Sequence, residues 1–130
     1  MEQGTRGSVR IGEIGVDQTI QGVALLSVRG EHDLNTAPAL KSKLGEAGGG
    51  PVVVDLSPAT FVDSSILGTI LEARRHAQQA DVGFAVCHDG RTDAVARVLE
   101  ITGLHRELPV HATRGEALTA AADGSAKKAT

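Results

Sequence analysis

Two hydroxyls and a carboxylate stand together in the run Asp63-Ser64-Ser65, which follows an apolar stretch and a short loop. Apolar residues then recur on one face over residues 64–80, a spacing typical of an amphipathic α-helix. The three side chains are therefore expected at the first turn of a surface helix. A hydroxyl in that place can carry a phosphate as a switch, whereas a serine nucleophile needs a positioned base beside it.

Two interpretations of this run are compatible with each other. A side-chain oxygen of the run can cap the helix, because it satisfies N–H groups of the first turn and contributes ~1 kcal/mol. The N-terminus of a helix also carries partial positive charge and free N–H donors, so it tolerates a phosphate on Ser64. The added charge, roughly −1.5 to −2 at pH 7, would lie beside Asp63 and change which surfaces can dock there.

The sequence offers no catalytic set. Neither Ser57 nor Ser64 lies in a G-x-S-x-G motif, and His76 is about three helical turns from Ser64. No Walker loop and no G-x-G-x-x-G occurs, so we predict no catalytic residue and no cofactor. The histidines lack paired metal-ligand spacing, so we expect surface or hydrogen-bonded side chains and no metal site; they are His32, His76, His88, His105 and His111.

A second polar cluster, Gly-Glu-His-Asp-Leu-Asn-Thr, occupies residues 30–36 at the end of a predicted strand. Asn35 or Thr36 can cap the helix expected from residue 37. If the strands at 23–29 and 51–55 run parallel through that crossover helix, their C-terminal ends lie at one edge of the sheet. The loop around Asp33 and the helix start at Ser64 would then form one surface.

Composition limits the classes of protein to which this chain can belong. The chain has 130 residues, 41% of them apolar, which suits one domain with a Val/Leu/Ile/Ala core because aromatics are only 2%. A net charge of −3 without a Lys/Arg stripe argues against direct contact with nucleic acid. No segment reaches the ~18 apolar residues that a membrane helix needs. The lone Cys87, expected to be buried in a strand, excludes an internal disulfide, and a reducing cytoplasm is the expected location.

Periodicity predicts nine elements in the order β-β-α-β-α-β-α-β-α. The expected strands cover residues 9–15, 23–29, 51–56, 82–87 and 108–110, and the expected helices cover 37–47, 64–80, 94–101 and 113–121. This order predicts an α/β fold with a mixed sheet of about five strands and about four helices packed on it. We expect residues 9–121 to form a single domain, with a flexible N-terminus at 1–8 and a flexible tail at 122–130.

Three short motifs in this chain, taken in order, resemble those of the STAS domain family. RGEHDLNTA at residues 29–37 resembles the first signature of that family. VVDL at 53–56, followed by FVDSSILG at 61–68, resembles the phosphoserine signature of its anti-sigma factor antagonist branch. VLEITGL at 98–104, followed by LPV at 108–110, resembles the C-terminal part, so the resemblance covers nearly the whole chain.

The resemblance implies a STAS-like sheet and a bacterial partner-switching regulator that is not itself an enzyme. Members of that branch bind an anti-sigma factor when unphosphorylated, which frees a sigma factor and alters transcription, for example in a stress response. An anti-sigma factor with serine-kinase activity phosphorylates the serine after the motif aspartate, which is Ser64 here, and a phosphoserine phosphatase resets it. The implied partner-binding residues are Asp33, Asn35, Thr36, Asp63, Ser65, Ile66, Leu67 and Gly68.

Two alternatives stay open. The chain could be a STAS adaptor that does not switch, within a larger signalling or lipid-transport complex. It could instead be a small-molecule or nucleotide sensor with a pocket under the loops of Asp33 and Asp63. One position departs from the family pattern, because Ile66 stands where Gly is frequent; its side chain is expected to add bulk beside Ser64 and to affect partner choice and phosphorylation.

Overall fold

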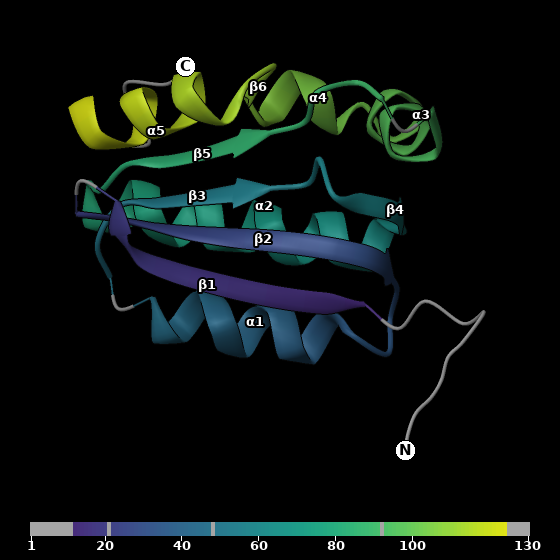
Figure 1. Ribbon diagram of the computed structural model, residues 1–130, viewed down its shortest axis with the longest axis horizontal. Coiled ribbons are helices and arrows are strands. Elements are labelled where there is room, and N and C mark those ends of the chain that lie inside the picture. Colours follow the sequence, from purple (N-terminus) through teal and green to yellow (C-terminus); the bar gives the residue numbers. More distant parts are fainter. Residues whose placement is uncertain (1–11, 21, 48, 92, 125–130) are drawn as a thin grey trace.

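The computed structural model describes residues 12–20, 22–47, 49–91 and 93–124, which form helices on both faces of one sheet (Figure 1). The strands are β1 (Glu13–Ile20), β2 (Val23–His32), β3 (Val52–Asp55), β4 (Ala59–Val62), β5 (Phe84–Cys87) and β6 (Val110–His111). The helices are α1 (Ala37–Glu46), α2 (Ser64–Ala80), α3 (Asp93–Thr102), α4 (Leu104–Glu107) and α5 (Arg114–Asp123). None of the helices in these ranges is long and apolar enough to cross a membrane.

The sheet is mixed, as the order of elements predicts. Its strand order is β1-β2-β3-β5-β6, and β4 pairs with β2 off this path. β1 and β2 form an antiparallel hairpin, whereas every other pairing within the described residues is parallel. Parallel strands place their carboxyl ends at one edge, which collects the loops that follow β2, β3 and β5.

Side chains along the central strands point alternately to the two faces of the sheet, and this divides the core into two layers. Val52 and Val54 pack in the larger cluster with residues of α1, α2 and α3, whereas Val53 packs in the smaller cluster under α5. Successive side chains of a strand point to opposite faces, so an unbroken apolar run becomes buried on both sides. A strand was predicted over the apolar run at residues 51–56, and the observed strand, Val52–Asp55, confirms it within one residue at each end.

The second half of β2 changes its neighbour. Residues 24–27 pair with β3, and residues 30–32 pair with β4. Gly30 has a φ of +84° and stands where the register to β4 shifts, a backbone state that glycine adopts without steric cost. This bend carries the end of β2 alongside β4, which leads directly into α2.

Some predicted boundaries differ from the observed ones. The first strand begins at Glu13, and residues 9–11 lie outside the described residues. Residues 57–60 were predicted as loop, but Ala59–Val62 forms β4, whose burial does not alternate and so gives no strand signal. The short α4 was not predicted, β6 lies later than the expected strand at 108–110, and α5 extends to Asp123.

Candidate functional site

The carboxylate of Asp63 caps α2. Its backbone is extended (φ −107°, ψ −178°), as at an N-cap. Oδ1 accepts hydrogen bonds from the backbone N–H groups of Ser65 at 2.9 Å and Ile66 at 3.1 Å. One oxygen therefore satisfies two N–H groups that have no partner within the helix. The predicted side-chain cap is confirmed, and Asp63 provides it.

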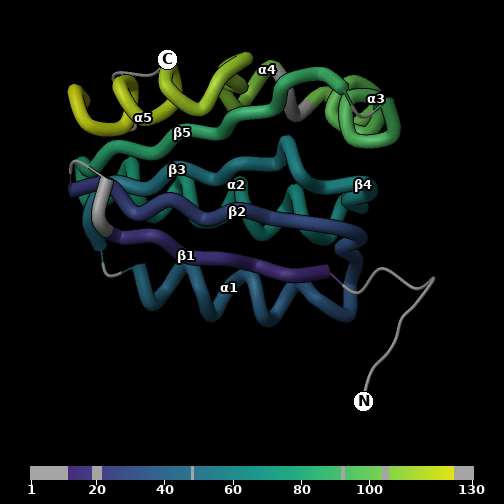
Figure 2. The backbone as a smooth tube through the Cα atoms, in the orientation of Figure 1, coloured from purple at the N-terminus to yellow at the C-terminus, as the bar shows by residue number. Residues whose placement is uncertain are grey.

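The second oxygen of Asp63 connects two loops that are far apart in the sequence. Oδ2 accepts a hydrogen bond at 3.1 Å from the backbone N–H of Leu34, in the loop after β2. The predicted parallel pairing of β2 and β3 is confirmed. The ends of β2 and β4 consequently lie at the same side of the sheet as the start of α2 (Figure 2). The predicted proximity of the two polar loops is therefore confirmed.

Hydrogen bonds within the loop after β2 hold its shape. The Oδ1 of Asp33 accepts from the backbone N–H of Asn35 at 2.9 Å. The Thr36 hydroxyl accepts from the backbone N–H of Asp33 at 3.0 Å and lies 3.1 Å from Nδ1 of His32. Thr36 occupies the predicted N-cap position of α1 but makes no side-chain cap bond to that helix. Side-chain capping of α1 was predicted wrongly, because this hydroxyl bonds backwards into the loop.

Ser64 is the first residue of α2, and its side chain is exposed. Ser65 is half-buried, and its backbone oxygen accepts a hydrogen bond from the Thr69 hydroxyl at 3.0 Å. Of the two serines, Ser64 is the one more open to an approaching enzyme. Its hydroxyl sits at the positive end of the helix dipole, directly after the carboxylate of Asp63.

Two exposed apolar side chains accompany these polar groups. Leu34 is 69% exposed, and Phe61, in β4, is 41% exposed. We use the term Ser64 face for the surface made by Asp33, Leu34, Asp63 and Ser64, which the hydrogen bond between Leu34 and Asp63 joins; Phe61 lies two residues before Asp63 in the chain. Large apolar groups exposed beside charged ones are typical of a protein-binding surface. Sequence reasoning missed Leu34 and Phe61, because exposure of an apolar residue gives no signal in the chain.

The residues that follow Ser64 divide between core and surface. Ile66 and Leu67 are fully buried in the larger core cluster, and neither offers side-chain surface to a partner. The bulk expected from Ile66 beside Ser64 is therefore not found, because the side chain points inward. Gly68 is exposed, and a Cβ added there would meet no atom within 4 Å.

A further polar cluster, which was not predicted, lies under α5. The buried carboxylate of Asp55 accepts hydrogen bonds from Arg114 Nη2 at 2.7 Å and Nε at 3.1 Å, and from the backbone N–H of Ser57 at 2.9 Å. Burial alone raises the pKa of the Asp55 carboxyl, but these bonds outweigh it and hold the pKa below its ordinary value. The ion pair fastens the first turn of α5 to the end of β3.

Cys87 and His88 adjoin this cluster. Burial, with the nearby Asp55 carboxylate, raises the pKa of the Cys87 thiol to about 12, so it stays protonated and is a poor nucleophile. The prediction that Cys87 is buried is confirmed. His88 is also buried; its Nδ1 accepts a hydrogen bond from the backbone N–H of Gly90 at 3.2 Å, as expected of a hydrogen-bonded histidine, whereas its Nε2 has no partner within the described residues. Burial lowers the pKa of His88.

Metal and acid–base chemistry find little support at these sites. Within residues 12–20, 22–47, 49–91 and 93–124, no three His, Cys, Asp or Glu side chains are grouped so that they could hold a metal ion. The ring of His32, at the end of β2, is buried and bonds at Nε2 to the Arg29 carbonyl at 2.9 Å, so it is not open to act on the exposed serine. The arrangement is suited to docking and to modification of a hydroxyl.

Comparison with known proteins adds independent information. The chain matches the STAS domain family over residues 16–117. It is 36% identical over 106 residues to the anti-sigma-F factor antagonist RsfB of Mycobacterium tuberculosis, which is 79% of this chain and 84% of that protein. It is 30% identical over 103 residues to an anti-sigma F factor antagonist of Paenibacillus polymyxa, covering 76% of this chain and 86% of that protein.

A solved structure gives the same assignment of fold. The anti-sigma factor antagonist from Mycobacterium paratuberculosis superposes with a TM-score of 0.74 at 32% sequence identity. The match covers 87% of this chain and 96% of that one. The predicted resemblance and the STAS-like α/β fold are both confirmed.

Proposed function

The chain belongs to the STAS domain family, and from this premise we propose that it is an anti-sigma factor antagonist. It binds an anti-sigma factor while Ser64 is unmodified and thereby frees the sigma factor for transcription. The names of its relatives support this function. The proposed activity places the protein in the bacterial cytoplasm, where sigma factors act.

One observation carries the proposal. The Asp63 carboxylate bonds both to the start of α2 and to the loop after β2, so the exposed Ser64 is held beside the exposed Leu34. A partner that docks on the exposed Leu34 side chain of the Ser64 face would therefore cover the serine as well. Of the residues implied by the family motifs, those with surface to offer are Asp33, Asn35, Thr36, Asp63, Ser65 and Gly68.

A phosphate on Ser64 would release this partner without any change of fold. The N–H groups of Ser65 and Ile66 already donate to Asp63, so the phosphate would compete for donors that are in use and stand beside a like charge. Its charge would then lie in the interface. Unpaired or like charges there cost several kcal/mol, and each ~1.4 kcal/mol is tenfold in affinity.

The switch needs two further partners. We propose that the anti-sigma factor, or a related serine kinase, transfers the γ-phosphoryl group of ATP to Oγ of Ser64. A phosphoserine phosphatase then hydrolyses the phosphoserine and restores binding. The chain itself supplies the accepting hydroxyl and the docking surface, and no catalytic group.

Binding measurements with purified candidate anti-sigma factors of the host test this proposal. We expect Ser64→Ala to bind about as tightly as the wild type and to accept no phosphate when ATP is added. We expect Ser64→Glu to bind about 100-fold more weakly, or worse. Ser65→Ala is the matched control, since it removes the neighbouring hydroxyl and should still gain one phosphate by intact-mass spectrometry.

The same experiment separates the switch from its nearest alternative. Tight binding that neither Ser64→Glu nor added ATP weakens would identify a STAS adaptor that does not switch. Phosphate found on Ser65 and absent from Ser64 would show that the acceptor was assigned wrongly.

A further inference from the structure

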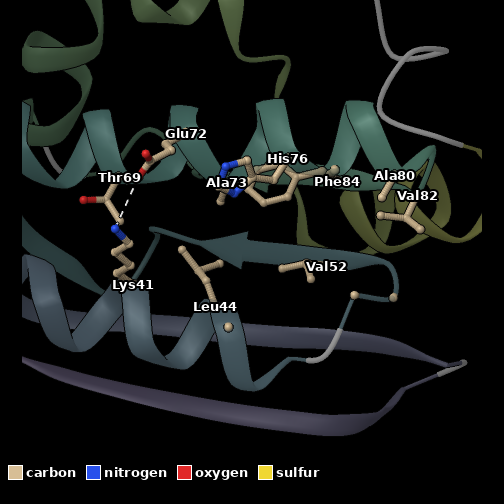
Figure 3. Close-up of a pocket in the computed structure, with 14 residues that line it drawn as sticks. Lys41, Leu44, Val52, Thr69, Glu72, Ala73, His76, Ala80, Val82 and Phe84 are labelled. Atoms are coloured by element: carbon tan, nitrogen blue, oxygen red, sulfur yellow. Dashed lines mark ion pairs between the residues drawn. The ribbon is translucent and has the colours of Figure 1, made fainter.

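A cavity of about 330 Å³ opens between α1 and α2, away from the Ser64 face. It lies where the C-terminal half of α2 passes over the start of β3 and the end of α1 (Figure 3). Phe84 and Val52, both buried, belong to its apolar lining. The pocket that the sequence suggested under the loops of Asp33 and Asp63 is a different place.

Small residues make this cavity. The face of α2 that lines it carries Ala73, Ala77 and Ala80. Three glycines line it from the other side: Gly45 in the last turn of α1, and Gly49 and Gly50 between α1 and β3. A leucine at any of the three alanines would fill part of the space and bury more apolar surface. The side chains that face the cavity from α2 and from the opposite side are short, so the space between α1 and α2 stays open to solvent.

The two ends of the cavity differ in chemistry. Lys41, Thr69 and Glu72 gather at one end, and Ala80 and Val82 lie at the other (Figure 3). The Nζ of Lys41 is 4.0 Å from Oε1 of Glu72, which is too long for a hydrogen bond, and both side chains are more than half exposed. The pair therefore keeps an ammonium donor and a carboxylate acceptor available beside a mostly apolar chamber, whose middle also carries the imidazole of His76 (Figure 3).

We propose that this cavity binds a small amphipathic molecule with an apolar chain and one uncharged hydroxyl head. At ~30 Å³ per water-sized atom, the volume holds roughly ten non-hydrogen atoms. A hydroxyl can accept from Lys41 and donate to Glu72, so it matches both groups at once. A carboxylate head can pair with Lys41 but then stands beside the like charge of Glu72, and an ammonium head can pair with Glu72 but then stands beside Lys41, so neither satisfies both groups. The chain would extend over Phe84 towards Val82.

Binding of 1-octanol tests the proposal directly. We expect saturable binding to the intact chain, followed by methyl and amide chemical shifts in NMR titrations, with a Kd of about 1 mM or below. Octanoate and octylamine, which share the chain and differ in head charge, should bind at least about tenfold more weakly. Shifts confined to the residues that line the cavity would place the site.

Two kinds of variant make the result specific. Ala73→Leu fills the middle of the cavity, and Ala80→Leu, at an exposed position, fills its apolar end. Each should weaken octanol binding at least about tenfold, and the second serves if the first folds poorly. Ala94→Leu, on the exposed side of α3, is the matched control and should change nothing. Glu72→Gln should remove the discrimination against octanoate.

Four outcomes would overturn the inference. Octanol that does not saturate shows that no site exists. Equal binding of octanoate or octylamine by the wild type shows that the head group was assigned wrongly. Unchanged octanol binding in a folded Ala73→Leu or Ala80→Leu variant places the ligand elsewhere, and continued discrimination against octanoate in Glu72→Gln removes the role of that carboxylate. None of these results depends on whether Ser64 is phosphorylated.

Discussion

Asp63 uses its two oxygens for two different tasks, and an isosteric substitution can separate them. Oδ1 caps α2 through Ser65 and Ile66, while Oδ2 holds Leu34 in the neighbouring loop. Asparagine has the same shape but only one acceptor oxygen. Asp63→Asn can therefore keep the helix cap or the tie between loops, but not both. The cap engages two N–H groups and is expected to be the one that survives.

The structure gives the expected magnitudes. Loss of a side-chain N-cap costs ~1 kcal/mol, and loss of one further hydrogen bond at a partly exposed site costs ~1 kcal/mol. Asp63→Ala removes both and should lower the free energy of unfolding by ~2 kcal/mol, whereas Asp63→Asn should lower it by ~1 kcal/mol. The matched control is Asp33→Asn, because a single oxygen of Asp33 accepts the Asn35 N–H and asparagine can supply it.

Urea denaturation of the three variants measures these differences, and amide hydrogen exchange locates them. In Asp63→Asn, the Leu34 N–H should lose protection, while the Ser65 and Ile66 N–H groups keep theirs. The tie between the loops would be refuted if Asp63→Asn matched Asp33→Asn within ~0.3 kcal/mol, the error of such comparisons. Unchanged protection at Leu34 would refute it equally.

Three further predictions concern the rest of the fold. The folded state keeps the Cys87 proton up to a pKa of about 12, so between pH 9 and 10 only the unfolded thiol ionises, and the free energy of unfolding should fall by ~1 kcal/mol. In chemical denaturation, Cys87→Ala should remove this part of the pH dependence of stability. Gly83→Ala should cost ~2–3 kcal/mol, since its Cβ would overlap the backbone of α5, whereas the control Gly68→Ala should gain ~0.5–1 kcal/mol in the same thermal melts. Arg114→Met should lower the free energy of unfolding by ~1–2 kcal/mol at pH 7, because the variant leaves the Asp55 carboxylate buried and unpaired. The magnitude is reduced from that of a fully buried pair because half of the Arg114 side chain is exposed to solvent. The folded-state pKa of Asp55 is lowered, so this difference from the wild type should shrink as the pH falls below about 4 and through that pKa; a difference that persists in acid would contradict the assignment.

Local patterns were sufficient for most of the fold. The helix at Ser64–Ala80 and the central strand at residues 52–55 follow from 3.6-residue periodicity and from an unbroken apolar run. Both signals depend on neighbours in the chain. β4 was missed because it is four residues long, lies inside a polar connection and is stabilised by pairing with β2.

The candidate site divides in the same way. The hydroxyl of Ser64 and its place at a helix start could be read from the sequence, and the parallel crossover predicted that the Asp33 loop lies nearby. The hydrogen bond between the Leu34 N–H and Asp63 could not be read from the sequence, because it depends on the distance between two loops, and the whole sheet sets their positions. Sequence likewise gave no direction for the Ile66 side chain, which the helix rotates into the core.

The chain by itself determined the order of its elements apart from β4 and α4, the exposed serine at the start of a helix and the family resemblance, because each depends on residue types at short spacing. Only the tertiary structure decided the ion pair between Asp55 and Arg114, which are 59 residues apart, and the cavity between α1 and α2. Such features are set by the packing of distant elements, and packing depends on side-chain volumes and distances that periodicity does not encode.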